Sequence, residues 1–150
     1  MKVIAPRSRN IFDTACQVFV IPVNAVGAMG MGLAEQFKTH YPEAFQIYNQ
    51  RCRNGYIVPG TLTHASLLSL GEQHVLFFTT KDHWSGKSEI KWIEEGLMAL
   101  PSIMTTARLK SIAIPPIGCG EGGLSWEGSV KPLILKLLAD SDLIVELYDR

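Results

Sequence analysis

The sequence predicts a three-layer α/β/α domain, in which one sheet is covered by helices on both faces. Short apolar runs rich in Val, Ile and Phe alternate along the chain with stretches of helical pattern. These runs are too apolar for either side of a strand to face water, so both faces of the sheet must be covered. The chain has 150 residues, of which 47% are hydrophobic, and no linker divides it. We therefore expect a single domain over residues 1–150 with one compact core.

Six strands are predicted, four from strong apolar runs and two from weaker ones. The strong candidates are QVFVIPV, HVLFFTT, SIAIPPI and LIVELY, at residues 17–23, 74–80, 111–117 and 143–148. The weaker candidates are KVIAP at residues 2–6 and TLTHASLL at residues 61–68. All six are enriched in the residue types that fit a pleated, half-buried or buried surface.

Four helices are predicted between these strands, at residues 31–40, 42–53, 88–108 and 132–140. Pro42 and Pro132 stand in first turns, where a missing N–H costs nothing. Ser88 is the expected N-cap of the third helix. Pro101 lies inside that helix and is expected to kink or split it.

Composition excludes several classes of protein. The 14 basic residues balance the 14 acidic ones, so nucleic acid would have to be held by a local patch and not by a global field. The N-terminal segment lacks an apolar signal core and no run reaches 18 apolar residues, so neither a signal peptide nor a membrane contact is expected. Cys16, Cys52 and Cys119 form an odd set without C-x-x-C spacing, which favours reduced thiols, a cytoplasmic location and no metal site.

Two glycine-rich loops follow predicted strands: VNAVGAMGMG at residues 23–32 and PPIGCGEGG at residues 115–123. Glycine lets the backbone approach a ligand closely, so that successive N–H groups can cradle a phosphate. Ligands of open α/β sheets bind at the carboxyl ends of the strands. Glycine clusters are also typical of plain turns. Two such loops at one sheet edge nevertheless predict a clamp around a diphosphate.

Two familiar nucleotide-binding motifs are matched only in part, and the surrounding sequence excludes both. Gly118, Gly120 and Gly123 spell G-x-G-x-x-G, but the dinucleotide fold needs several strands after this fingerprint and only one remains. GKS at residues 86–88 resembles the end of a P-loop, but the earlier glycine of that motif falls on Lys81. Neither a Rossmann dehydrogenase nor a P-loop protein is expected.

Two reactive side chains have competing interpretations on the residues alone. Cys119, between glycines, is a candidate nucleophile with His83 or His64 as its base, although a small residue beside a phosphate is the favoured interpretation. Lys81 ends the apolar run of FFTTKDHWSGK, at residues 77–87. By itself this pattern is typical of a solvated charge where a strand leaves the core.

Three segments together carry a family resemblance: VNAVGAMGMGLAEQF, FFTTKDHWSGKSEI and IAIPPIGCGEGGLSW. In this order, each at a strand end, they resemble the macrodomain family. Within it they resemble the branch that holds the DarG antitoxin macrodomain and the terminal ADP-ribose glycohydrolase. The resemblance covers nearly the whole chain. It implies a three-layer α/β/α macrodomain with a mixed six-stranded sheet and no cofactor.

The resemblance also implies that ADP-ribose is the ligand or product. In such macrodomains its diphosphate is bound by backbone amides of the two glycine-rich loops. Its adenine end falls on Asn10 and Ile11, with Asn10 in place of a common aspartate, and Asn24 falls near the distal ribose. For Asn24 the alternative is an amide that stabilises its own turn. The implied contacts are Asn10, Ile11, Val23, Asn24, Gly30, Met31, Gly32, Leu33, Gln36, Thr80, Ile117, Gly118, Cys119, Gly120, Glu121, Gly122 and Gly123.

Lys81 matches the lysine that this branch uses as its catalytic residue. In the resembling enzymes it attacks the anomeric carbon of the distal ribose and expels the modified group, and water then clears the covalent intermediate. The attack needs an unprotonated amine. Apolar cover and a second positive charge favour that form, and we expect them from Phe77, Phe78, Trp84 and Lys87. Asp82 is expected to point away.

The second loop distinguishes two sides of the branch. The terminal ADP-ribose glycohydrolase has an aspartate at the position of Gly122, whereas the DarG-like loop, G-C-G-N-G-G-L-D-W, is similar to GCGEGGLSW here. The resemblance thus implies an N-glycosidic hydrolase that removes ADP-ribose from thymidine in DNA, with a DarT-type toxin as functional counterpart. Glu121 must turn to solvent or act in catalysis. The second, toxin-binding domain of full-length DarG has no room in this chain, so direct toxin neutralisation is not expected.

The segment KDHWSGKSEIK, at residues 81–91, offers a place for single-stranded DNA. It mixes lysines with Trp84, as sites for a single strand do. The alternative is a solvated helix start with a packed tryptophan. Two other functions also stay open: a non-catalytic reader of ADP-ribose, and a phosphatase acting on ADP-ribose 1″-phosphate.

Overall fold

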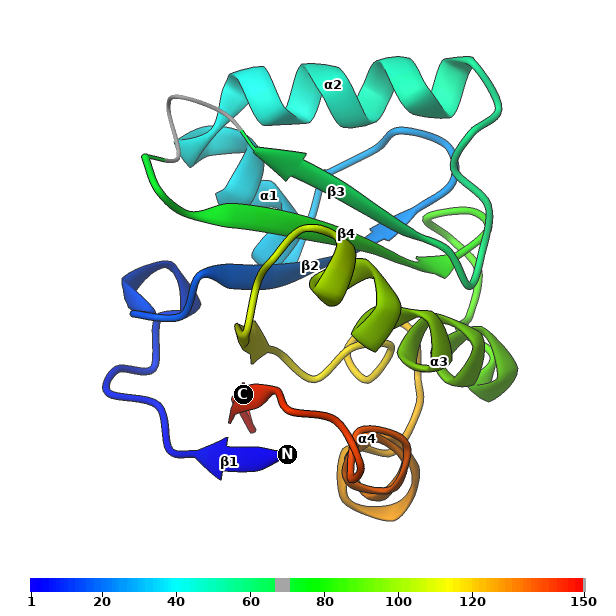
Figure 1. Ribbon diagram of the computed structural model, residues 1–150. Coiled ribbons are helices and arrows are strands. Elements are labelled where there is room, and N and C mark those ends of the chain that lie inside the picture. The colour runs from blue at the N-terminus through cyan, green and yellow to red at the C-terminus, as the bar shows by residue number, and fades with distance from the viewer. Residues whose placement is uncertain (67–70, 150) are drawn as a thin grey trace.

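Six strands form one mixed sheet in the computed structural model, which describes residues 1–66 and 71–149 (Figure 1). The strand order is β1-β6-β5-β2-β4-β3. The pairs β1–β6, β6–β5, β5–β2 and β2–β4 are parallel. The edge strand β3 pairs antiparallel with β4. The predicted fold class is confirmed. The strands are β1 (Lys2–Ile4), β2 (Val18–Asn24), β3 (Leu62–Ser66), β4 (His74–Lys81), β5 (Ser111–Ile114) and β6 (Ile144–Leu147).

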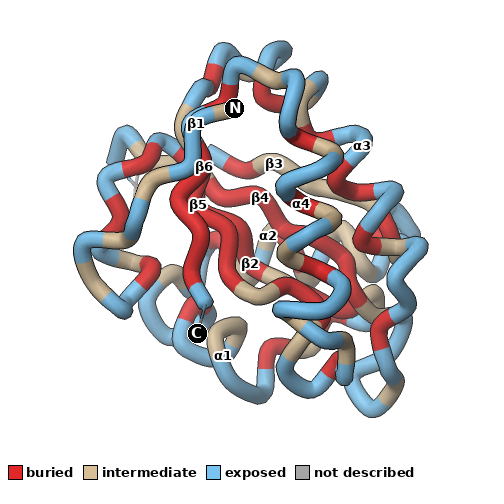
Figure 2. Tube along the Cα trace, turned by 90° about the horizontal axis from the view of Figure 1, so that it is seen from below, coloured by how far each residue is buried: buried red, intermediate tan, exposed pale blue. Residues whose placement is uncertain are grey.

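Two cores lie on the two faces of this sheet. Along β4, Leu76 and Phe78 pack into one core with α3 and α4, while Val75 and Phe77 pack into the other with α1 and α2. All four side chains are wholly buried, and the inner strands run as a continuous buried layer through the molecule (Figure 2). The sheet is therefore covered on both faces, as its apolar strands predicted. The helices are α1 (Gly32–His40), α2 (Pro42–Arg53), α3 (Ile90–Thr106) and α4 (Lys131–Leu137).

Two predicted element ends are wrong. The strand predicted at residues 111–117 ends at Ile114, because Pro115 and Pro116 have no N–H to donate to the sheet. Helix α3 begins at Ile90 with Glu89 as its N-cap residue, so Ser88 is not the cap. The Ser88 backbone N–H instead donates to the Gly122 carbonyl in the second glycine-rich loop.

The remaining differences concern helix continuity. Pro101 does not split α3, since Leu97, Leu100 and Met104 on its inner face are all buried in one core and keep both halves on the sheet. The helix predicted at residues 132–140 is preceded by a π-helical turn, η3 (Trp126–Val130), and its regular part ends at Leu137. A short 3-10 turn, η1 (Ile11–Asp13), precedes β2. Residues 67 and 68 of the predicted third strand lie outside the described residues. Among the helices described, none is both long enough and apolar enough to cross a bilayer.

The parallel pairing brings both glycine-rich loops to one edge. Strands β2, β4 and β5 point the same way, so their carboxyl ends meet there. Asn24 at the end of β2 pairs with Lys81 at the end of β4, and the next amide, Ala25 N–H, donates to the Lys81 carbonyl over 3.0 Å. The first glycine-rich loop therefore starts directly beside Lys81.

Candidate functional site

A cavity of about 800 Å³ opens at this edge of the sheet. The two glycine-rich loops and the end of β4 form its walls. Most of the predicted contact residues line it, together with Lys81. They are Val23, Asn24, Gly30, Met31, Gly32, Leu33, Thr80, Gly118, Gly120, Glu121 and Gly122.

The side-chain amide of Asn24 holds the first loop in shape. Its Nδ2 donates to the Ala28 carbonyl over 2.8 Å, and its Oδ1 accepts from the N–H groups of Val26 and Ala28. These bonds close the turn, so the turn-stabilising interpretation of Asn24 is confirmed. Asn24 also lines the cavity, and its contact with a ribose stays a prediction.

Two residues of α2 donate hydrogen bonds to backbone carbonyls of this loop. The sequence analysis missed both. Tyr48 is wholly buried and donates its hydroxyl hydrogen to the Asn24 carbonyl over 2.6 Å. Desolvation by burial raises the pKa of Tyr48. The Asn49 Nδ2 donates to the Gly27 carbonyl over 3.0 Å. No signal in the linear sequence pairs these helical residues with a loop more than twenty positions earlier.

The first turn of α1 lines the cavity next to the first glycine-rich loop. Gly32, Leu33 and Ala34 begin α1 and line the cavity. The first N–H groups of a helix have no partner within the helix, and they carry the positive end of its dipole. Such a helix start favours an anion, as the diphosphate prediction requires.

The second loop has a compact internal frame. Gly118 and Gly123 adopt positive φ angles of 73° and 82°, where glycine is favoured. The Leu124 N–H donates to the Gly118 carbonyl over 2.9 Å, and the Gly123 N–H donates to the Gly120 carbonyl over 3.1 Å. Between these anchors, the N–H groups of residues 120–122 donate to no other described residue. Three successive free donors therefore stand on the second wall of the cavity.

Gly122 is fixed by its surroundings. The Ser88 N–H donates to the Gly122 carbonyl over 3.0 Å. A Cβ at position 122 would lie 2.5 Å from the Gly118 carbonyl oxygen and would also meet the Ser88 Oγ. The Ser88 hydroxyl is buried and has no hydrogen-bond partner among the described residues. An aspartate therefore does not fit at position 122 on this backbone.

Lys81 is half-buried at the end of β4, and its Nζ donates to the Trp84 carbonyl over 3.2 Å. Of the residues expected to cover it, Trp84 lines the same cavity. Phe77 and Phe78 instead lie within the two cores beneath the strand. Asp82 is exposed and does not line the cavity, in agreement with the expectation that it points away.

Lys87 lies against the second glycine-rich loop. Its Nζ donates to the Glu121 carbonyl over 3.3 Å, and its side chain passes beside Gly123. Lys87, which was expected to supply a second positive charge near Lys81, thus forms a hydrogen bond to this loop. Glu121 itself is exposed and lines the cavity.

The geometry does not support Cys119 as a nucleophile. Its Sγ lies 3.3 Å from the Ile117 carbonyl, and burial raises the pKa of the thiol to about 11. His64 pairs with His74 over 2.9 Å, at the other end of β4. His83 is exposed and bonds to Ser85 over 2.8 Å. Neither candidate base bonds to the thiol.

Five predicted contacts lie outside the main cavity besides Cys119. Asn10 is exposed, and its Oδ1 already accepts from the Phe12 N–H over 3.0 Å as the cap of η1. Two others, Ile11 and Ile117, are buried core residues. Gln36 is exposed on α1 and Gly123 on the second loop. Their contacts with ADP-ribose stay predictions.

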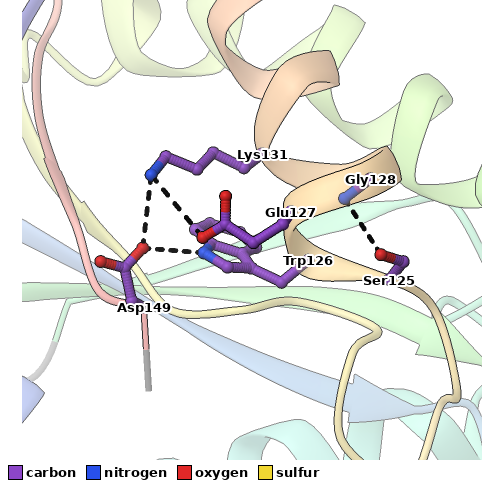
Figure 3. A network of polar contacts seen from close by, with 6 residues as sticks. All are labelled: Ser125, Trp126, Glu127, Gly128, Lys131 and Asp149. Atoms are coloured by element: carbon purple, nitrogen blue, oxygen red, sulfur yellow. Dashed lines mark hydrogen bonds and ion pairs between the residues drawn. The ribbon is translucent and has the colours of Figure 1, made fainter.

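A network of polar contacts joins the C-terminal segment to η3 (Figure 3). The Trp126 indole N–H donates to the Asp149 carboxylate over 2.8 Å, and the Lys131 ammonium lies 3.6 Å from the same oxygen. The indole hydrogen bond, with the nearby Lys131 charge, lowers the pKa of Asp149. Asp149 and Trp126 also line a second cavity of about 490 Å³ together with Cys119. This network ties the C-terminal segment to η3, directly behind the loop.

Over residues 1–66 and 71–149, no group of three or more His, Cys, Asp or Glu side chains is arranged to hold a metal ion.

Comparisons with known proteins identify the family of this chain. The Macro domain family model matches residues 20–133. A DNA ADP-ribosyl glycohydrolase of Mycobacterium tuberculosis is 36% identical over 141 residues, which cover 92% of this chain and 40% of the relative. The chain thus spans about 40% of the length of that curated relative.

Solved structures of macrodomain proteins have the same fold as this chain. The macrodomain of Mycobacterium tuberculosis DarG superposes with a TM-score of 0.91 at 30% identity, covering 99% of this chain and 97% of that one. Thermosipho africanus DarTG, solved in complex with ADP-ribose, superposes with a TM-score of 0.85 at 30% identity, covering 97% of this chain and 41% of that one. A Thermosipho africanus relative is named a DNA ADP-ribosyl transferase–DNA ADP-ribosyl glycohydrolase fusion protein, with 32% identity over 155 residues, 93% of this chain and 40% of the relative.

Proposed function

Because the chain belongs to the macro domain family, we propose that it is a hydrolase that removes ADP-ribose from thymidine in single-stranded DNA. One observation carries the proposal. Lys81 ends β4 at a cavity whose other walls are two glycine-rich loops with free backbone donors. The names of the DarG relatives, which state DNA ADP-ribosyl glycohydrolase activity for those proteins, support the choice of substrate.

The two loops supply the binding half of the mechanism. N–H groups at the start of α1 and in residues 120–122 are suited to the oxygens of a diphosphate. A diphosphate held between them leaves the distal ribose on the side of β4. The ribose carbon that bears the DNA base is then within the reach of Lys81, so the loops position the reacting carbon.

Lys81 supplies the chemical half. Its neutral amine attacks the anomeric carbon, and the N-glycosidic bond to the base breaks. The electron pair of that bond passes to the base nitrogen, which takes up one proton as the new ammonium nitrogen loses one. The sugar opens to an imine on Lys81, and one water hydrolyses this imine to ADP-ribose and the free amine. The hydrogen bond from the Lys81 Nζ to the Trp84 carbonyl holds the amine at the cavity wall.

The substrate requires a second activity, because an ADP-ribosyl transferase must first modify the DNA. A relative that fuses such a transferase to a glycohydrolase supports a DarT-type toxin as the functional counterpart. The proposed role of this chain is to reverse that modification.

The decisive experiment compares the wild type with Lys81→Ala on a single-stranded oligonucleotide carrying ADP-ribosylated thymidine. We expect the wild type to release ADP-ribose, and the variant to be slower by at least about a thousand-fold, as when a covalent nucleophile is removed. Lys136→Ala is the matched control, since Lys136 is an exposed lysine of α4 outside the cavity. Borohydride should trap a covalent adduct on the wild type only.

Each other outcome favours a different function. Equal release by the wild type and Lys81→Ala contradicts the role of this lysine. Binding of ADP-ribose without release by either protein favours the non-catalytic reader. Phosphate release from ADP-ribose 1″-phosphate favours the phosphatase.

A further inference from the structure

The mouth of the cavity carries two unusually exposed apolar side chains. Trp84 is 59% exposed and Met31 is 61% exposed. Both line the cavity, Trp84 from the loop after β4 and Met31 from the first glycine-rich loop. Large apolar groups left in water at the rim of a cavity are typical of a surface that a ligand covers.

The Trp84 backbone is tied to the reactive amine. Its carbonyl accepts the hydrogen bond from the Lys81 Nζ over 3.2 Å. Trp84 therefore lies beside the group attached to the carbon that Lys81 attacks in the proposed reaction. Under the proposed function, that group is a base still joined to its DNA strand.

The Trp84 indole is also oriented before any ligand arrives. The His83 ring lies against it, with ring centroids 5.1 Å apart and an angle of 35° between the planes. His83 is in turn held by Ser85, whose hydroxyl lies 2.8 Å from its Nδ1 and whose N–H donates to the same atom over 3.2 Å. A preoriented exposed ring loses little conformational freedom when a second flat ring stacks on it.

Charges around this ring are mixed and not strongly basic. Lys87 and Lys91 are exposed in the segment that carries this ring, and so are Asp82 and Glu89. Phosphate contacts alone would give weak binding here, because the acids offset the lysines. Stacking on an aromatic ring does not depend on this balance.

We propose that Trp84, flanked by Met31, is a stacking platform for a base of the single strand that carries the ADP-ribose. The inference rests on the proposed function and extends it to the strand around the modified nucleotide. It favours single-stranded over duplex DNA, because the bases of a duplex are already paired and stacked.

The test measures equilibrium binding with Lys81→Ala as the starting protein, so that substrate is not consumed. Dissociation constants are compared for free ADP-ribose and for a single-stranded oligonucleotide bearing ADP-ribosylated thymidine. Adding Trp84→Ala is expected to weaken binding of the oligonucleotide about ten-fold, within the range for one base stacked on an aromatic ring. Binding of free ADP-ribose should change far less. Trp84→Phe should restore most of the loss.

Tyr56→Ala is the matched control, because Tyr56 is an aromatic residue that is 73% exposed and does not line the cavity. Unchanged oligonucleotide binding in Trp84→Ala overturns the platform. So does an equal loss for free ADP-ribose, which would assign Trp84 to the ADP-ribose site, or an equal loss for an ADP-ribosylated peptide. Failure of the proposed function is seen separately, as no release by wild-type protein in which Trp84 is intact.

Discussion

The Tyr48 hydroxyl donates to the Asn24 carbonyl over 2.6 Å and lies 3.0 Å from the Oδ1 of the same residue. Tyr48 belongs to α2, and Asn24 is the last residue of β2. This contact joins a buried helical side chain to the point where the first glycine-rich loop begins. The shape of the loop therefore depends on the packing of α2 against the sheet.

Tyr48→Phe should lower both stability and ligand affinity. The substitution leaves the buried Asn24 carbonyl without this donor, which is expected to reduce the free energy of unfolding by about 2 kcal/mol. The loosened loop should also bind ADP-ribose more weakly. Urea denaturation and calorimetric titration measure the two effects. The exposed Tyr56→Phe should change stability by less than about 0.5 kcal/mol, and a similar loss in both variants would contradict this account.

Gly122→Ala and Gly120→Ala should differ although they stand in the same loop. A Cβ at position 122 would lie 2.5 Å from the Gly118 carbonyl oxygen, whereas a Cβ at position 120 meets no atom within 4 Å. We expect Gly122→Ala to lose about 2 kcal/mol of unfolding free energy through backbone displacement. Gly120→Ala should stay within about 0.5 kcal/mol of the wild type. Thermal and urea unfolding decide this, and equal losses would refute the steric argument.

Cys119→Ala should retain glycohydrolase activity, because burial keeps this thiol protonated at neutral pH. Its pKa is raised from 9.0 to about 11. The raised pKa contributes stability that is fully present below about pH 9 and is lost as the pH rises through about 11. The wild type should therefore lose stability relative to Cys119→Ala over that window. Urea midpoints at pH 7 and pH 10.5 measure the difference in stability. Loss of glycohydrolase activity in Cys119→Ala would contradict the prediction and support the thiol as the nucleophile.

Thr14→Val should destabilise the segment before β2. The Thr14 hydroxyl donates to the Glu146 carboxylate over 2.6 Å, both residues are buried, and the Tyr148 hydroxyl donates to the same oxygen. Removing one donor from this network is expected to cost about 2 kcal/mol. Thr39→Val is the control, because Thr39 is exposed on α1 and, within the described part of the chain, its hydroxyl bonds only to the Glu35 carbonyl one turn earlier. Hydrogen exchange of residues 11–16 should quicken in Thr14→Val alone.

The sequence by itself determined the layers of the fold and the chemical character of the site. The apolar run in each strand predicts burial on both faces of the sheet, because such a run cannot face water on either side. The two glycine-rich loops could be placed at one edge, since parallel strands bring their carboxyl ends together. The resemblance of the three loop segments then singled out Lys81, which the residues alone left as a solvated charge.

Only the tertiary structure decided which groups hold the site together. Ser88 was expected to cap α3, but its N–H bonds to Gly122 and its hydroxyl is turned against that glycine. Tyr48 reaches Asn24 only because α2 packs on the face of the sheet beside β2 and β4. Such partners are far apart in the chain, and spacing along the sequence carries no information about them. They are chosen by strand order and helix packing, since a buried polar group must bond to whatever partner the folded chain brings within reach.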